Sequence, residues 1–116
     1  IDGYRADVAG FIPTNFWDNA RRELDQIKPV FMLAEWDARD LHKNAFDMTY
    51  AWKLHDTLHE VAKGHKDASG VYLHFAHALS AWPDNAIKMN FVDNHDSPDE
   101  YSGGLFISKE GRYKFI

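Results

Sequence analysis

The chain has 116 residues, which fits one small domain, and its 45% hydrophobic share is enough for a packed core. Its net charge of −5 argues against a nucleic-acid partner, because phosphate binding needs clustered lysine and arginine. The apolar runs are too short to cross a bilayer. The absence of cysteine excludes disulfides and leaves the redox compartment open.

The first third of the chain predicts a strand, a helix and a second strand. Residues 2–9 are expected to form a short strand that runs into a loop, and the chain begins without the polar residues that usually lead a mature terminus, so we expect an excised fragment. Pro13 suits the first turn of the following helix, and Pro29 ends it. The apolar positions that share one face of this helix are Phe16, Trp17, Ala20, Leu24 and Ile27. Residues 30–34 are a continuous apolar run, typical of a strand buried on both faces.

The remaining two thirds predict two further strands and two further helices. After a polar loop we expect, in chain order, a weaker strand at 45–49, helices at 50–63 and 70–82, and a buried strand at 87–92. Residues 97–116 are expected to form an irregular tail, with a hairpin around Glu110 and Gly111. Strands that alternate with helices predict an α/β fold with a parallel sheet.

Three of the predicted strands end in polar residues. They are Arg5 and Asp7 for the first strand, Glu35 for the second, and Asn94, His95 and Asp96 for the last. In α/β barrels the C-terminal ends of the strands form the active-site face, and several strands contribute catalytic groups. Loops are polar in any protein, so one charged residue at a strand end means little. Acids at three strand ends make that explanation much less attractive.

Three segments also carry a family resemblance. Residues 2–7, DGYRAD, are similar to the fourth-strand motif of glycoside hydrolase family 13, the α-amylase family. Residues 33–36, LAEW, resemble its fifth-strand motif, and residues 91–96, FVDNHD, resemble its seventh. The resemblance implies a partial (β/α)8 TIM barrel, with residues 1–116 forming strands four to seven of a catalytic domain.

The resemblance also implies a role for each matching residue. Asp7 would be the nucleophile of a retaining α-glucan hydrolase, and would form a covalent glycosyl-enzyme intermediate. Glu35 would be the general acid and then the base, and Asp96 would bind sugar hydroxyls and favour the distorted ring. Four further residues are expected to bind substrate or orient the nucleophile: Arg5, Asn94, His95 and Trp36.

The chemistry of the residues agrees with these roles. Retaining hydrolysis needs two carboxyl groups about 5–5.5 Å apart, one ionised and one protonated. Adjacent parallel strands lie about 4.8 Å apart, so Asp7 and Glu35 at neighbouring strand ends would meet this distance. Arg5 favours the charged form of Asp7, which a nucleophile requires.

One departure from the family pattern narrows the activity. Val8, Ala9 and Gly10 follow Asp7, where typical α-amylases carry a Lys-His pair. This favours the α-glucosidase, cyclomaltodextrinase or neopullulanase side of the family over an endo-acting α-amylase. The expected partner is an α-glucan or maltooligosaccharide, with no cofactor required. A calcium site in the parent enzyme is compatible with this sequence but is not indicated by it. The parent enzyme is expected in the periplasm or outside the cell rather than in the cytoplasm.

A second hypothesis is that the chain alone is a non-catalytic barrel fragment. A partial barrel leaves open sheet edges, which template pairing with other chains, so self-association is expected. A metal-binding module is a third alternative, because His55 and His59, and also His74 and His77, stand at helical spacing. No third ligand accompanies either pair, and we expect all four to be helix-surface histidines.

The remaining aromatic residues have simpler expectations. Trp17, Trp52 and Trp82 lie on predicted helices and are expected in the core. Trp36 follows Glu35 directly, so it has a better claim to a wall of a sugar subsite. Tyr4 alternates with Arg5 and is expected to point towards the helix layer.

Overall fold

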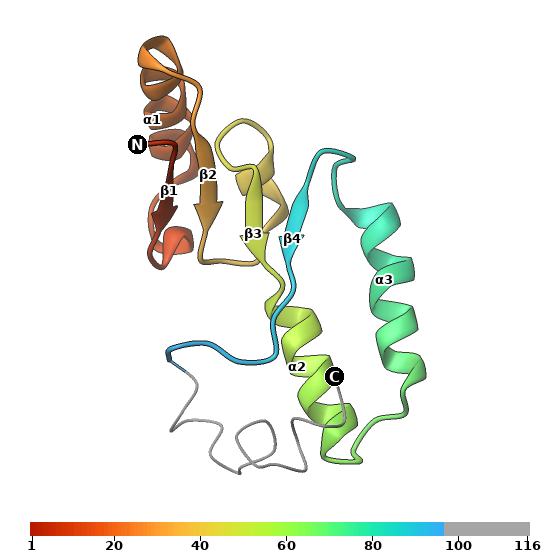
Figure 1. Ribbon diagram of the computed structural model, residues 1–116. Helices are drawn as coiled ribbons and strands as arrows, with labels where there is room; N and C mark the ends of the chain where they lie inside the picture. Colours follow the sequence, from red (N-terminus) through yellow and green to blue (C-terminus); the bar gives the residue numbers. More distant parts are fainter. Residues whose placement is uncertain (97–116) are drawn as a thin grey trace.

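The computed structural model describes residues 1–96, and Figure 1 shows a parallel sheet whose strands alternate with helices. In chain order the elements are β1 (Gly3–Ala6), η1 (Ala9–Phe11), α1 (Thr14–Ile27), β2 (Phe31–Ala34), η2 (Arg39–His42), β3 (Met48–Tyr50), α2 (Trp52–Ala62), α3 (Ser69–Ala81) and β4 (Ile87–Met89), where η1 and η2 are short 3-10 helices. The strands pair in the order β1-β2-β3-β4, and every pair is parallel. The predicted partial α/β barrel is confirmed.

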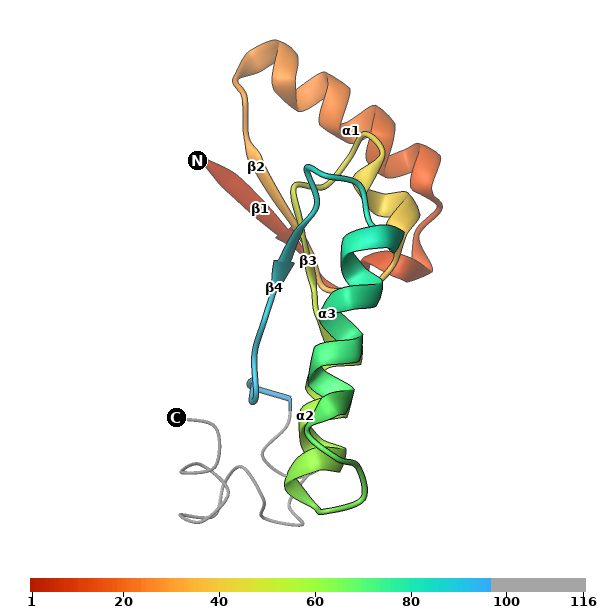
Figure 2. The same cartoon turned by 90° about the vertical axis from the view of Figure 1, so that its right-hand side faces the viewer.

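One face of the sheet is covered by the helices, which Figure 2 shows together on one side of the strands. Neighbouring residues in the register point to the same face, and the row Ala34, Thr49 and Lys88 lies on the covered face. Ala34 and Thr49 are fully buried there. Tyr4 pairs with the buried Met32 and so points to the helix layer, as predicted.

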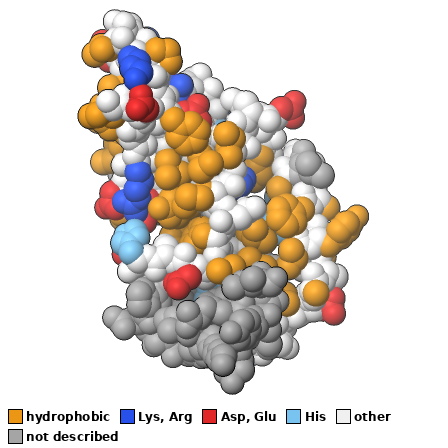
Figure 3. All heavy atoms as spheres, in the orientation of Figure 1, with side chains coloured by type: hydrophobic (Ala, Val, Ile, Leu, Met, Phe, Trp, Pro, Cys, Tyr) orange, Lys and Arg blue, Asp and Glu red, His pale blue; other side chains and the backbone are white. Residues whose placement is uncertain are grey.

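The opposite face of the sheet is open. Phe31 and Ile87 point to this side, and they are 44% and 45% exposed. Figure 3 shows hydrophobic side chains gathered over the strands on this face. In a closed barrel the same face is filled by layers of side chains from all eight strands. The four strands therefore form an open section of a barrel.

Helix α1 packs onto the covered face of β1 and β2 through its apolar stripe. Trp17 and Leu24 contact the core cluster, and the Trp17 ring meets Phe46 edge to face with centroids 5.2 Å apart. The helix ends at Ile27, where the backbone becomes extended before Pro29. The predicted helix and the core contacts of Trp17 and Leu24 are confirmed, but two positions of the predicted apolar face are wrong, because Phe16 and Ile27 are 54% and 86% exposed. The buried core residues in this cluster are Ala6, Ala9, Val30, Met32, Ala34, Leu41, Ala45 and Phe46.

The prediction that His55 and His59 lie on the surface of α2 is wrong. Their side chains are 0% and 3% exposed. The buried residues of α2 are Leu54, His55, His59 and Ala62, so the two histidines share the buried face with aliphatic residues. Phe91 stacks on the His55 ring with centroids 4.8 Å apart, which explains the burial.

The other histidine and tryptophan predictions fare differently. His77 is exposed on α3, as expected, whereas His74 is half-buried. Trp52 and Trp82 are also half-buried, and each packs against other rings. No helix of residues 1–96 is long and apolar enough to span a membrane.

All four predicted strands are shorter in the structure, and the first and the last differ most. The strand expected at 2–9 ends at Ala6, because the backbone turns at Val8, and the strand expected at 87–92 ends at Met89. The predicted tail at 97–116, with its hairpin around Glu110 and Gly111, lies outside the described residues.

Candidate active site

The three predicted acids lie beyond the C-terminal ends of their strands. Asp7 follows β1 directly, Glu35 follows β2, and Asp96 lies in the segment after β4. The Glu35 amide donates a hydrogen bond of 3.0 Å to the Ala6 carbonyl, which keeps the end of β2 beside β1. The parallel pairing therefore brings Asp7 and Glu35 to the same edge of the sheet.

Arg5 joins the first two acids. Its Nη1 lies 2.7 Å from Oδ1 of Asp7, and its Nη2 lies 2.6 Å from Oε1 of Glu35. Nε donates to the Tyr50 hydroxyl at 3.3 Å, which fixes the third side of the guanidinium. The hydrogen bonds to Tyr50 and Asp7 raise the pKa of Arg5, so the bridge stays charged.

Asp7 and Glu35 differ in their surroundings. The Asp7 side chain is 73% exposed, and the hydrogen bond from Arg5 lowers the pKa of its carboxyl. Glu35 is buried, with 7% of its surface exposed. Its Oε2 accepts a hydrogen bond of 3.1 Å from the Val8 amide, so a donor holds each of its oxygens. The predicted charged state of Asp7 beside Arg5 agrees with this geometry.

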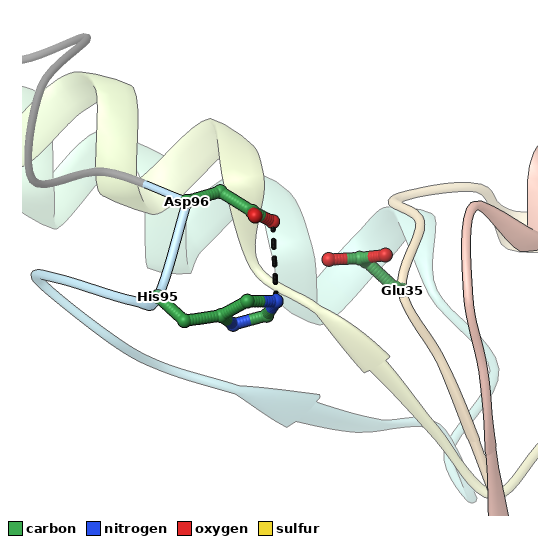
Figure 4. A group of neighbouring side chains, drawn as sticks. All are labelled: Glu35, His95 and Asp96. Carbon is green, nitrogen blue, oxygen red and sulfur yellow. Dashed lines mark ion pairs between the residues drawn. The ribbon is translucent and has the colours of Figure 1, made fainter.

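Figure 4 shows His95 and Asp96 turned towards Glu35 from the segment after β4. One ligand-type atom from each of the three residues lies within 4.8 Å of the others. Nε2 of His95 lies 3.4 Å from Oδ2 of Asp96. The Asn94 side-chain oxygen accepts the Asp96 amide at 3.0 Å and orders the turn that carries both. The structure thus brings the last predicted strand end to the Arg5 bridge.

The group of Glu35, His95 and Asp96 has the ligand types of a divalent metal site. Arg5, however, places its positive charge 2.6 Å from Glu35, which opposes a second cation there. Polar side chains that converge beside a guanidinium suit the hydroxyl groups of a neutral sugar better.

Trp36 packs against the turn after β1. A Cβ atom at Gly10 would lie 2.0 Å from Cε2 of Trp36, so only glycine leaves room for this ring. The Phe11 ring contacts the Trp36 ring at a tilt of 54°, with centroids 5.4 Å apart. Trp36 therefore supports the segment that carries Glu35, and its role as a subsite wall stays a prediction.

Two supporting features escaped the sequence analysis. Tyr50, the partner of Arg5, is buried at the end of β3, and alternation with Met48 is the signal that would have placed it on the inner face. Val8 adopts a left-handed backbone with φ 42° and ψ 46°, which no sequence signal at a valine predicts.

A third missed feature is the ion pair that anchors the loop after Glu35. Oδ1 of Asp37 lies 2.6 Å from Nζ of Lys88, and Oδ2 accepts the Lys53 amide at 3.0 Å. Lys88 also donates to Thr49 at 2.8 Å, and its ammonium lies 3.7 Å from the centroid of the Trp82 ring. Burial lowers the pKa of Lys88 despite these partners. The pair ties the Glu35 loop to β4 and to the start of α2.

Comparison with known proteins completes the assignment. No protein-family profile matches the chain. A cyclomaltodextrinase of Geobacillus thermopakistaniensis is 35% identical over 105 residues, which cover 84% of this chain and 18% of that protein. A maltogenic α-amylase of Bacillus acidopullulyticus is 30% identical over 105 residues, which again cover 84% of this chain and 18% of that protein. The chain belongs to the α-amylase family.

Solved structures of the α-amylase family agree with this assignment. A maltogenic α-amylase from Thermotoga neapolitana superposes with a TM-score of 0.75 and 31% identity, covering 83% of this chain and 23% of that one. An α-amylase from Lactobacillus plantarum superposes with a TM-score of 0.76 and 27% identity. The match covers 83% of this chain and 27% of that one. The chain spans only 18% of the curated relatives it matches.

Proposed function

We propose that this chain carries the catalytic carboxylates of a retaining hydrolase that cleaves α-glucosidic bonds in α-glucans or maltooligosaccharides. The observation that carries the proposal is the Arg5 bridge, which holds Asp7 and Glu35 on one guanidinium, with His95 and Asp96 facing Glu35. Because the chain spans 18% of its curated relatives, the activity is proposed for the complete protein that contains it.

In this proposal Asp7 attacks the anomeric carbon while Glu35 donates a proton to the departing glycosidic oxygen. The sugar is then held as an ester of Asp7. Glu35, now ionised, removes a proton from a water molecule that attacks the same carbon and releases Asp7. Arg5 keeps Asp7 ionised and oriented, and Asp96 and His95 bind sugar hydroxyls.

The substrate class is supported by what the relatives are named for. The matching proteins include a cyclomaltodextrinase and maltogenic α-amylases, and Val8, Ala9 and Gly10 follow Asp7 in place of a Lys-His pair. We therefore favour short or cyclic maltooligosaccharides over long starch chains as substrates.

The test is hydrolysis of maltooligosaccharides and a nitrophenyl α-glucoside by the complete protein and three variants. Asp7→Asn and Glu35→Gln are each expected to lower the rate about a hundredfold to ten-thousandfold. Asp25→Asn is the matched control, because Asp25 also pairs with an arginine but lies on α1. Wild-type rates in either site variant would refute the assignment.

A second experiment addresses the covalent intermediate. A fluorinated glycosyl fluoride slows breakdown of the glycosyl-enzyme, so the peptide that contains Asp7 should gain the mass of one sugar. Labelling of a peptide without Asp7 would contradict its role as nucleophile. An inverting enzyme would show no labelled peptide at all, since it forms no such ester.

The second candidate concerns the 116-residue chain alone, as a non-catalytic fragment that associates with itself. The observation in its favour is the exposed inner face around Phe31 and Ile87, flanked in the described sheet by β1 and β4 as edges. We expect dimers or larger species in light scattering, and little hydrolysis, because substrate-positioning groups from other strands are missing. A monodisperse monomer would exclude the association.

A further inference from the structure

The backbone of Val8 is strained. Its φ of 42° lies in the left-handed region, and Val8 is the one non-glycine residue of 1–96 with a positive φ. A β-branched side chain crowds the following carbonyl in this conformation, so it is rare. Such strain persists only where surrounding contacts hold it, and it clusters at functional sites.

The contacts that hold the turn are identifiable. The Phe11 amide donates to the Val8 carbonyl at 3.1 Å, and Nε1 of Trp17 donates to the Ala9 carbonyl at 2.9 Å. Ala9 is fully buried in the core, and Gly10 lies directly under the Trp36 ring. The turn is thus fixed from the helix α1 side and from the loop that carries Glu35.

The chain leaves β1 after Ala6, and the Val8 amide then points at the candidate general acid. The amide nitrogen lies 3.1 Å from Oε2 of Glu35, while Arg5 occupies Oε1. Had β1 continued in an extended conformation, this amide would have followed the strand. With one donor on each oxygen, the plane of the buried carboxyl group is fixed.

We propose that Val8 is a positioning residue for Glu35, acting through its backbone amide and not through its side chain. The proposal rests on the proposed function of Glu35. A backbone amide cannot take up the catalytic proton, so it holds Oε2 without competing for proton transfer. It also favours the ionised form that Glu35 adopts after it has protonated the leaving group.

The first test is a pH titration by NMR of the ¹⁵N-labelled chain, with ¹³C-labelled glutamate side chains. It uses Asp7→Asn as background, because titration of Asp7 would itself move the neighbouring Val8 amide. We expect the Val8 amide proton to shift together with the Glu35 carboxyl carbon, and this shift to vanish when Glu35→Gln is added. The Phe11 amide, in the same turn, is the internal control. If the Val8 amide proton does not shift when Glu35 titrates, the proposal is overturned.

The second test replaces the Val8 amide by an ester in the complete protein, which removes the N–H and keeps the side chain. The basic limb of the kcat/KM profile should move up by on the order of one pH unit. The same replacement at Phe11 removes a hydrogen bond of the turn that does not reach Glu35, and should leave the limb in place. A lower rate with an unmoved limb at Val8 would mean a merely structural role and overturn the proposal. If the wild type hydrolyses no α-glucoside, the proposed function fails, while the titration still decides the hydrogen bond.

Discussion

The buried histidine pair of α2 predicts a loss of stability in mild acid. Nε2 of His59 lies 3.0 Å from Nε2 of His55, and both rings are closed off from solvent. Burial, followed by electrostatic effects of His55 and Lys63, lowers the pKa of His59 from 6.5 to about 4, against smaller opposing effects of a hydrogen bond with the Val92 backbone and of Asp56. Protonation of His59 in the folded chain is therefore unfavourable.

The sign follows from comparing the folded and unfolded states. An unfolded His59 binds a proton as the pH falls through 6.5, whereas the folded one does so only near pH 4. The contribution of His59 to stability is complete above pH 6.5 and is lost as the pH falls towards 4. At about 1.4 kcal/mol per unit, the interval corresponds to roughly 3 kcal/mol. This is a large part of the 5–15 kcal/mol that is usual for a folded domain.

The assay is urea unfolding of the chain between pH 7 and pH 4, followed by circular dichroism at concentrations where light scattering shows one species. Between pH 7 and pH 4 the free energy of unfolding of His59→Gln should fall by about 3 kcal/mol less than that of the wild type. His77→Gln, which changes an exposed histidine on α3, should lose as much as the wild type. If His59→Gln and the wild type lose the same stability, the burial of His59 does not control the acid response.

Three further variants test the supports of the candidate site. Gly10→Ala should lower the unfolding free energy by about 1–3 kcal/mol, because its Cβ would lie 2.0 Å from the Trp36 ring, whereas Gly70→Ala meets only Thr57 at 3.5 Å and should be neutral or stabilising. Asp37→Asn leaves the charge of Lys88 without its carboxylate and should cost about 3–5 kcal/mol in urea unfolding, of which Lys88→Met in the same chain recovers part. Arg5→Lys keeps the charge but loses the fork that reaches both acids, so kcat/KM of the complete protein should fall at least tenfold.

The fold was predictable because its main signals are local. Pro13 precedes helix α1 and Pro29 follows it, so the two prolines mark its ends. The apolar run before Glu35 forms strand β2. The end of β1 was not predictable, because the chain leaves the sheet through a left-handed valine. A glycine or asparagine at position 8 would have predicted a left-handed turn, whereas valine favours the extended backbone.

The His55 and His59 error has a different cause. Leu54 and Leu58 stand four positions apart in the helix expected at 50–63, a spacing that favours a buried stripe on their side and a wet face for the histidines; Leu54 is indeed buried, whereas Leu58 is half-buried. In the structure the buried face also includes the histidines, because Phe91 returns after β4 and stacks on His55. That contact joins residues 36 positions apart in the chain, so no helical periodicity encodes it.

The candidate site shows the same division between local and distant information. The acids at the strand ends could be predicted, because parallel strands deliver their C-terminal residues to one edge. What holds them there could not: the Arg5 bridge needs the hydroxyl of Tyr50 from β3, and the Glu35 loop needs Lys88 from β4. The alternation of residues along β3 and β4 predicts which face of the sheet each partner lies on. It does not predict which side chains of the other strands each partner contacts. The motif residues therefore predict the chemistry, and the side chains that position them become visible only once the register of β1 to β4 is known.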